Sequence, residues 1–441
     1  MITTSERRFL PARWLLYATV LYGATSLVYF VAPILGDFSR VFLGTTPFPH
    51  DTVLNAGILE WDFRALFDSR LVVFEWPAGF PLTNTLAGVE NLLGWQIFYA
   101  PLRATGLSVA GAYNVVWLLS LLISGVGTAT LARRVGASEV GAVVAGFVFA
   151  FYPLHIDHSI HLQTMSVCWS PFAVAGLERT LAEKGLKGPA LLAASFIMTA
   201  LCGLYFAVFL PLVLILYVTI SLLTGRYRLR WSIAVRICLA ALVSVIVLSP
   251  LLLHYYRFSS VTGGYSHPAE MLTKFSFPLP GLLRTPIWLA TWSHTPLATV
   301  AAETGAFPGV VALSLFVLAI AVRGRETQEK SIVVLLISLA AIAFVLALGP
   351  VLTLHTSTPY EPLRWIPLPG RIWLAFTAIR WPTRMTLYAG LFASVLAGLG
   401  ADRLLRQSPG RRRMVTAIVF LLLVLELRPS NSYARESLVL A

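Results

Sequence analysis

Three acidic residues that could act as a general base follow the first apolar segment of the chain. Asp51 lies in Pro47-Phe48-Pro49-His50-Asp51-Thr52, and Glu60 and Asp62 come shortly after it. A carboxylate at an apolar boundary is partly desolvated, which strengthens it as a proton acceptor. We predict that Asp51 is the catalytic base, with Glu60 and Asp62 as the reserve candidates. The alternative is that all three are solvated loop acids.

A second group of chemically capable residues is the segment His155-Ile156-Asp157-His158-Ser159-Ile160-His161. Imidazole and carboxylate groups bind metal ions, phosphates and sugar hydroxyls. In a helix, His158 and His161 would share one face. The spacing matches no zinc motif, so we assign His158 and His161 to substrate binding and no residue to a metal. The cofactor stays open, a divalent metal ion included, and a polar start of an interfacial helix is the alternative.

Glu303, Arg380 and Arg384 each lie just before an apolar segment. We predict that Glu303 contributes to the substrate pocket, although an acid at a helix N-terminus also stabilises the helix dipole. A guanidinium group binds two phosphate oxygens at once, so Arg380 and Arg384 are predicted to bind a lipid phosphate. The competing interpretation is that both arginines only reach toward lipid headgroups.

The elements that carry these residues are predicted to be membrane helices. The chain has 441 residues, of which 57% are hydrophobic and 12% charged, and its mean hydropathy is +0.77. This composition predicts an all-α polytopic membrane protein. We expect about 11 transmembrane helices of roughly 20 residues each. Their predicted centres are Tyr22, Ser120, Phe147, Pro171, Ser195, Leu212, Leu242, Leu313, Leu339, Phe392 and Leu421.

The charged residues give an orientation. Short loops rich in Lys and Arg alternate with loops that hold all eight histidines. By the positive-inside rule the basic loops and the N-terminus are cytoplasmic, and the histidines lie on the extracytoplasmic face. The outer loops are then residues 37–109, 154–163, 255–306 and 351–383, within a membrane domain of residues 1–428 that a short tail, 429–441, follows. The net charge of +13 is therefore attributed to topology, not to nucleic-acid binding.

The first outer loop is predicted to contain helices that do not span. The apolar stretch Leu92 to Leu102 is too short to cross a bilayer, and a crossing there would invert every later loop. It is expected to lie in the interface, as is a juxtamembrane helix around Glu60-Trp61-Asp62-Phe63. Further along, the apolar run from residue 189 to residue 223 is too long for one helix, and Cys202-Gly203-Leu204-Tyr205 is predicted to turn it back.

Several functional classes remain compatible with these sequence features. There is no Walker motif, no dinucleotide-binding glycine pattern and no nucleophile elbow. The leading hypothesis is a membrane enzyme with its site at the outer surface. The alternatives are a transporter or flippase of a lipid-linked glycan, and a non-catalytic lipid-binding assembly subunit. A transporter would need charged residues at the centres of the spans, and these are nearly free of charge.

A set of short motifs resembles a known superfamily over nearly the whole chain. The motifs are Ala112-Tyr113-Asn114, Ala132-Arg133-Arg134, His161-Leu162-Gln163, Trp169-Ser170-Pro171, Glu303 with Phe307-Pro308-Gly309, Leu368-Pro369 and Arg380-Trp381-Pro382-Thr383-Arg384. In this order they resemble bacterial GT-C glycosyltransferases of the protein-mannosyltransferase-like and YfhO-like group. Many relatives continue into a soluble outer domain after the position where this sequence ends.

The resemblance implies a GT-C-like fold in the bacterial cytoplasmic (inner) membrane, with the active site on the extracytoplasmic face. It implies a sugar donor linked to polyprenyl phosphate and an acceptor that is a glycan, lipid or protein. An acid in the first outer loop would deprotonate the acceptor hydroxyl, which displaces the lipid phosphate with inversion. Asp51 takes that position here. Arg380 and Arg384 would neutralise the leaving phosphate, and His158, His161 and Glu303 would shape the pocket.

Overall fold

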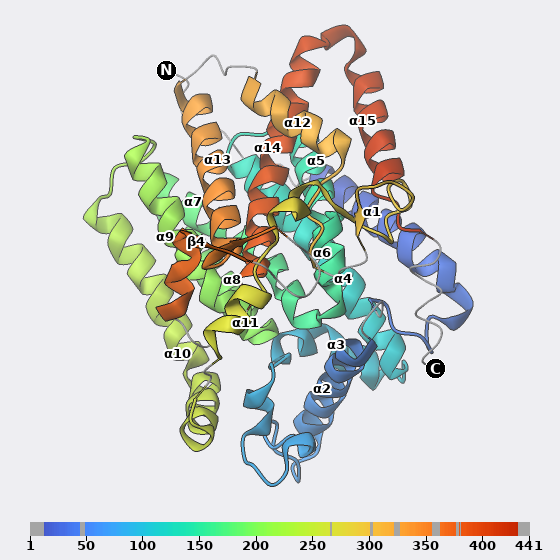
Figure 1. Cartoon of the computed structure of the whole chain (residues 1–441), viewed down its shortest axis with the longest axis vertical. Coiled ribbons are helices and arrows are strands. Elements are labelled where there is room, and N and C mark those ends of the chain that lie inside the picture. The colour runs from blue at the N-terminus through green and yellow to red at the C-terminus, as the bar shows by residue number, and fades with distance from the viewer. Residues whose placement is uncertain are drawn as a thin grey trace.

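The protein is described by a computed structural model that covers residues 13–44, 49–264, 267–299, 303–321, 327–354, 362–375, 379 and 381–430. Within these residues the fold is almost entirely helical (Figure 1). The strands form two small pairs: β1 (Thr285–Pro286) runs parallel to β2 (Ala298–Thr299), and β3 (Val351–Thr353) runs antiparallel to β4 (Pro362–Pro367). The prediction of an all-α architecture is confirmed at this level.

Seven helical segments in the described part of the chain are long and apolar enough to cross a membrane. They are Arg13–Asp37, which begins with α1 (Arg13–Ser26); α4 (Val109–Arg134); Glu139–Ile160, which begins with α5 (Glu139–Ala150) and continues through α6 (Pro153–Asp157); α9 (Leu204–Leu223); α10 (Trp231–Thr262); α13 (Thr327–Ala347); and Pro382–Gln407, which contains α14 (Met385–Gln407). The chain is therefore a multi-pass helical membrane protein.

The other four predicted centres also lie in helices, but in shorter ones. These are α7 (Ser170–Ala182), α8 (Lys187–Cys202), α12 (Val310–Ala321) and α15 (Arg412–Glu426). At about 1.5 Å per residue, a helix of this length covers less than the roughly 30 Å of hydrocarbon. The structure thus places a helix at each of the eleven predicted centres, of which seven have full spanning length.

Helix α14 lies at the centre of the helical bundle and is mostly buried (Figure 1). Its glycines allow this packing. A Cβ atom at Gly398 would meet the carbonyl oxygen of Gly141 in α5, and one at Gly400 would meet the carbonyl oxygen of Leu315 in α12. Small residues of this kind let membrane helices approach closely where apolar burial alone gives no preference. The N-terminal end of this well-packed helix carries Arg384.

Contacts between helix ends fall into two groups. At one end, Arg134 pairs with Glu183, and Ser138 donates to Asp402. We call this the basic end, because it holds the predicted basic loops. At the other end, Trp288 donates to Asp157 and Tyr152 donates to the carbonyl of Ala306. We call this the histidine end. Helices that cross a membrane in alternating directions bring every second connection to the same end, and the two groups of contacts agree with this arrangement.

The long connection between α1 and α4 forms a helical unit at the histidine end. It contains α2 (Pro49–Phe67) and α3 (Gln96–Ala104), which lie together in Figure 1. Both predicted helices of the first outer loop, around residues 60–63 and 92–102, are therefore confirmed as helices. Between them lie short 3-10 turns: η3 (Pro77–Gly79), η4 (Thr85–Gly88) and η5 (Leu93–Trp95).

The predicted reversal at Cys202-Gly203 is confirmed, since α8 ends at Cys202 and α9 begins at Leu204. A side chain at Gly203 would collide with the carbonyl oxygen of Gln163, which explains why glycine occupies this close approach. Four further helical pieces lie at the histidine end: η7 (Leu162–Trp169), α11 (Ala269–Lys274), η8 (Leu279–Leu283) and η9 (Pro369–Ala375).

Candidate active site

Four chain segments far apart in the sequence bring ionisable side chains together at the histidine end. Asp51 lies in the first turn of α2, and His158 begins η6 (His158–Ile160), directly before His161. Glu303 precedes α12, and Arg384 ends η10 (Pro382–Arg384) at the start of α14. We call Asp51, His158, His161, Glu303 and Arg384 the ionisable cluster. Each of them was predicted to be a site residue, with Asp51 facing the helix end that carries His158, but the individual contacts among them were not predicted.

The two histidines share one carboxylate. His158 Nδ1 lies 2.9 Å from Glu303 Oε1, and His161 Nε2 lies 3.3 Å from the same oxygen. The second nitrogen of His161, Nδ1, lies 3.5 Å from Asp51 Oδ2. The imidazole of His161 therefore stands between two carboxylates, one from the loop before α12 and one from α2.

Burial differs sharply along this chain of contacts. His158 is inaccessible and Glu303 is 5% exposed, whereas the side chain of Asp51 is 41% exposed. Burial alone raises the pKa of Glu303, but His158, His161 and Arg384 outweigh it and lower that pKa to about 2. Glu303 is therefore a carboxylate at neutral pH. Asp51 is the acid of the cluster that a substrate can reach.

The backbone of Glu303 is held in an unusual conformation. Its φ angle is +59°, in the left-handed region that non-glycine residues rarely adopt. The amide of Glu303 donates to Asp157 Oδ2, and the other oxygen of Asp157 accepts from Trp288 Nε1 at 3.1 Å. Asp157 thus fixes the loop that directs Glu303 toward the histidines. Strained positions of this kind concentrate at functional sites.

Arg384 is a buried cation that can still donate a hydrogen bond. It is 5% exposed, and its guanidinium carbon lies 4.5 Å from the ring centre of Tyr205 and 5.3 Å from that of Trp381. Trp381 in turn stacks on Phe275 at 3.8 Å. Among the described residues, Arg384 Nε has no hydrogen-bond partner. A buried guanidinium with a free N–H beside aromatic walls can receive an anion such as phosphate.

Unpartnered polar atoms are a feature of the whole cluster. Within the described part of the chain, no hydrogen bond satisfies His158 Nδ1 and Nε2, His161 Nδ1 or either carboxylate oxygen of Glu303. The 2.9 Å contact between His158 and Glu303 is thus a close contact of two polar atoms without hydrogen-bond alignment. Catalytic hydrogen bonds are often poorly aligned until the substrate is bound.

The two reserve candidates lie away from the cluster. Glu60 is bound to Arg103 at 2.8 Å, Tyr99 at 3.0 Å and Arg64 at 3.1 Å. Burial raises the pKa of Glu60, but these neighbours lower it overall. These contacts join α2 to α3. Arg380, the other predicted phosphate ligand, lies outside the described residues.

Asp62 has a different environment. It is fully buried on the inner face of α2, and neither of its carboxylate oxygens has a hydrogen-bond partner among the described residues. Burial raises the pKa of Asp62 well above its ordinary value of 3.8. Such a residue is kept as a neutral acid, with no access to an acceptor substrate.

Sequence reasoning did not assign Asp157, Tyr205 and Trp381 to the site. Asp157 stood in the histidine-rich segment, so its position was a usable signal, but its role through the backbone of Glu303 was not visible. His155 from the same segment is turned away and lies 3.1 Å, through Nδ1, from the carbonyl of Phe149. Tyr205 and Trp381 look like ordinary membrane aromatics in sequence.

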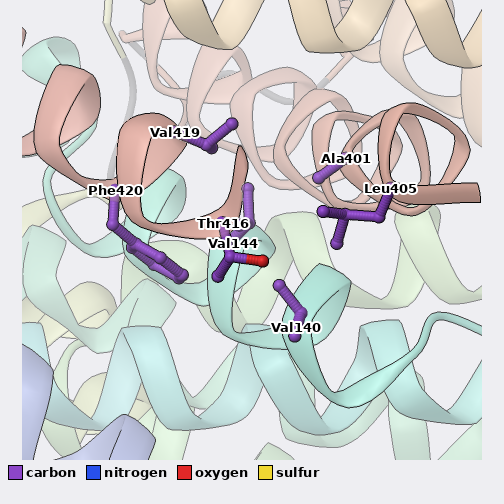
Figure 2. Close-up of a pocket in the computed structure, with 7 residues that line it drawn as sticks. All are labelled: Val140, Val144, Ala401, Leu405, Thr416, Val419 and Phe420. Atoms are coloured by element: carbon purple, nitrogen blue, oxygen red, sulfur yellow. The ribbon is translucent and has the colours of Figure 1, made fainter. Parts of the chain in front are cut away.

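Metal binding has no direct support in the described part of the chain, where no group of three or more His, Cys, Asp or Glu side chains is arranged to hold a metal ion. The hollow in Figure 2 is a separate feature. It lies between α5, α14 and α15 and is lined by Val140, Val144, Ala401, Leu405, Thr416, Val419 and Phe420. None of these residues is ionisable, so the hollow offers no acid or base.

No family model and no curated protein matches this chain. The functional argument therefore depends on the geometry of the ionisable cluster.

Proposed function

We propose that the protein is a glycosyltransferase that uses a sugar donor linked to polyprenyl phosphate. It transfers the sugar, with inversion, to a hydroxyl acceptor on the extracytoplasmic face of the bacterial cytoplasmic membrane. The proposal places the chain in the GT-C superfamily. The observation that carries it is the combination of an accessible acid, Asp51, with a buried cation, Arg384, at one end of a membrane bundle.

The chemistry needs these two groups in different surroundings. The acceptor hydroxyl gives its proton to Asp51, and its oxygen attacks the anomeric carbon of the donor. The bond from that carbon to the phosphate oxygen breaks, and the polyprenyl phosphate leaves with additional negative charge. Arg384 stabilises this charge, aided by the low-dielectric aromatic surroundings. Asp51 must exchange its proton with water after each turnover, and its partial exposure allows that.

The distribution of charge in the described helices favours an enzyme over a transporter. Arg384 lies at one end of the segment Pro382–Gln407, and Asp402 and Arg403 lie near the other. His158 similarly lies at the end of Glu139–Ile160. A path for a polar glycan would need such groups along the middle of the spans. A site at the membrane surface needs charged groups at the ends of the spans, where Arg384 and His158 lie.

The deciding experiment replaces Asp51 with Asn, which keeps the size and removes the basicity. Loss of a general base lowers the rate by about a hundred- to ten-thousand-fold. Transfer is measured in membranes with a panel of polyprenyl-phosphate sugars, and polyprenyl-phosphate binding serves as the control for folding. Full transfer activity in Asp51→Asn, Glu60→Gln and Asp62→Asn alike would end the glycosyltransferase proposal.

The orientation is tested separately. Ser69 lies between α2 and the 3-10 turns at the histidine end, and Gln328 lies in the first turn of α13 at the basic end; both are exposed. Single cysteines at these positions should react with membrane-impermeant reagents from opposite sides. Ser69→Cys should be labelled in intact cells and Gln328→Cys only after lysis. Labelling of both from outside would refute the topology.

A further inference from the structure

The position of His161 between two carboxylates restricts where its proton can be. A neutral imidazole has one N–H and one lone pair. Glu303 faces Nε2 at 3.3 Å and Asp51 faces Nδ1 at 3.5 Å. If His161 is neutral, only one of these carboxylates can receive an N–H, and the other faces a lone pair.

The surroundings of His161 favour the neutral form. Burial lowers the pKa of His161, and the charge of Arg384 and the neighbouring His158 act in the same direction. Glu303 and Asp51 oppose this effect without reversing it. Trp381, whose ring centre lies 6.4 Å from that of His161, closes another side with an uncharged group. These are the charged and titratable groups that face His161 in the described structure.

The single N–H is best placed on Nε2. Glu303 is the more deeply buried carboxylate. If the N–H of His161 pointed away from Glu303, water could not reach this carboxylate to replace it as a donor. Asp51 is 41% exposed and can be solvated from outside. The lone pair then lies on Nδ1, toward Asp51.

On the basis of the proposed glycosyltransferase function, we infer that His161 is a positioning residue that accepts a hydrogen bond from Asp51 once Asp51 has taken the proton of the acceptor hydroxyl. Before the reaction, the Nδ1 lone pair faces the Asp51 carboxylate unfavourably. When the O–H bond of the acceptor breaks and a new O–H bond forms on Asp51, the same pair becomes a hydrogen bond. The new hydrogen bond stabilises the product of the proton transfer, and in this way His161 assists the base.

Glu303 completes the arrangement by fixing the tautomer. Its carboxylate faces Nε2 at 3.3 Å and favours the tautomer that carries the proton on that nitrogen, which leaves Nδ1 free to accept. An amide in place of this carboxylate could donate to Nε2 and move the proton to Nδ1. His161 would then donate to the Asp51 carboxylate and weaken it as a base. The logic is that of a carboxylate that orients a catalytic imidazole.

The test is an infrared titration of the full-length protein in phosphatidylcholine vesicles, with no sugar donor present. The Asp51 carboxyl band is identified by its loss in Asp51→Asn. In His161→Phe, the pH at which Asp51 takes up its proton should fall by about one unit, a tenfold loss of proton affinity. Glu303→Gln should move it in the same direction. His161→Asn, whose amide oxygen can replace Nδ1 as acceptor, should restore part of the shift.

Two results would overturn the inference. An upward shift in His161→Phe would mean that His161 is a cation that stabilises ionised Asp51, and an unchanged titration would mean that the two do not interact. His50→Gln is the matched control, because His50 is an exposed histidine adjacent to Asp51 in sequence and should leave the titration unchanged. Circular dichroism measures the amount of folded protein in each sample. The intensity of the carboxyl band is divided by that amount, which excludes misfolding as the cause of a change.

A transfer assay then separates this inference from the proposed function. The acidic limb of the pH–rate profile should move to lower pH in His161→Phe, in parallel with the infrared midpoint, while the rate falls about tenfold. If transfer never depends on Asp51, the enzyme proposal fails even though the titration result stands. If Asp51 is essential and the titration does not move, only the role of His161 is wrong.

Discussion

The basic end and the histidine end of the bundle treat buried ionisable groups in opposite ways. At the basic end, Glu178 is 3% exposed and accepts from Tyr217 at 2.7 Å, Tyr227 at 2.8 Å and Arg226 at 2.5 Å. At the histidine end, Glu303 is equally buried, but neither of its oxygens has an aligned hydrogen bond within the described chain. Removing one partner of a satisfied buried pair is costly, whereas an unsatisfied buried group needs an explanation, and a ligand that binds there supplies one.

The same contrast separates the acids of α2. Glu60 is bound by two arginines and a tyrosine, while the side chain of Asp51 has, among the residues that the structure describes, only the 3.5 Å contact with His161. An acid that is already fully hydrogen-bonded has little capacity to accept a substrate proton. The comparison predicts that replacements at the paired acids reduce stability and that replacements at the unpaired ones reduce function.

The largest effect on stability is expected for Glu178→Ala. Removing one partner of a buried ion pair leaves Arg226 uncompensated and costs about 3–5 kcal/mol. The unfolding midpoint in detergent should drop accordingly, whereas Glu183→Gln should change stability by less than about 1 kcal/mol, because that surface pair is 43% exposed on the acid side. Equal losses in the two variants would remove the distinction between a buried network and surface pairs.

Asp62→Asn should change the pH dependence of stability. Because burial raises the pKa of Asp62 above 3.8, the folded state holds a proton that the unfolded state has released. The stability that this acid contributes is thus lost as pH rises through the range above 3.8, by up to about 1.4 kcal/mol per pH unit. Asn cannot ionise, so the variant should show a flatter curve between about pH 4 and 7. Parallel curves for wild type and variant would argue that Asp62 is solvated.

Arg384→Ala should weaken binding of polyprenyl phosphate by about 1–3 kcal/mol, as expected for one charge-assisted hydrogen bond. Lys at this position should restore only part of the affinity, because it cannot bind two oxygens in a plane. Arg371, an exposed residue of η9, supplies the control variant Arg371→Ala. Unchanged affinity in Arg384→Ala would make this arginine a packing residue. The same change at Arg380 tests the second predicted phosphate ligand.

The smallest effect is expected for Glu60→Gln, which weakens the contacts with Arg103 and Tyr99 but leaves a polar group in place. We expect a stability loss of about 1 kcal/mol, as for a partly exposed pair, and normal transfer activity. Both are measured on one preparation, so that the amount of folded protein normalises the rate. A hundredfold slower transfer would shift the role of base from Asp51 to Glu60.

The sequence was a good guide to helices and a partial guide to the site. Hydropathy located all eleven helix centres because each apolar segment carries its own signal. It overestimated the length of α7, α8, α12 and α15, since hydropathy marks an apolar segment without fixing where its helix ends. Asp51, His158, His161, Glu303 and Arg384 were chosen for their chemistry and position, and they do converge.

What the sequence could not supply was the contacts among these residues. Glu303 is more than 140 residues from His161, and no local pattern sets their distance or the orientation of the imidazole. It ranked Asp51 above Glu60 and Asp62 from position alone, because pairing with Arg103 and burial on the inner face of α2 depend on tertiary packing. The proton position on His161 follows only from knowing which carboxylate faces which nitrogen.

The length of helix α10 has a consequence for the position of the connection between α2 and α3. With 32 residues it is about 48 Å long, well beyond the roughly 30 Å of bilayer hydrocarbon. Near its far end, His254 stacks on Phe74 at 4.0 Å, and Tyr255 is hydrogen-bonded to Asn91 at 3.1 Å. The connection between α2 and α3 is thereby held against the C-terminal part of α10. In the proposed enzyme, α10 would thereby help to fix the chain that follows the helix carrying Asp51, so that contacts far from the ionisable cluster contribute to the position of the base.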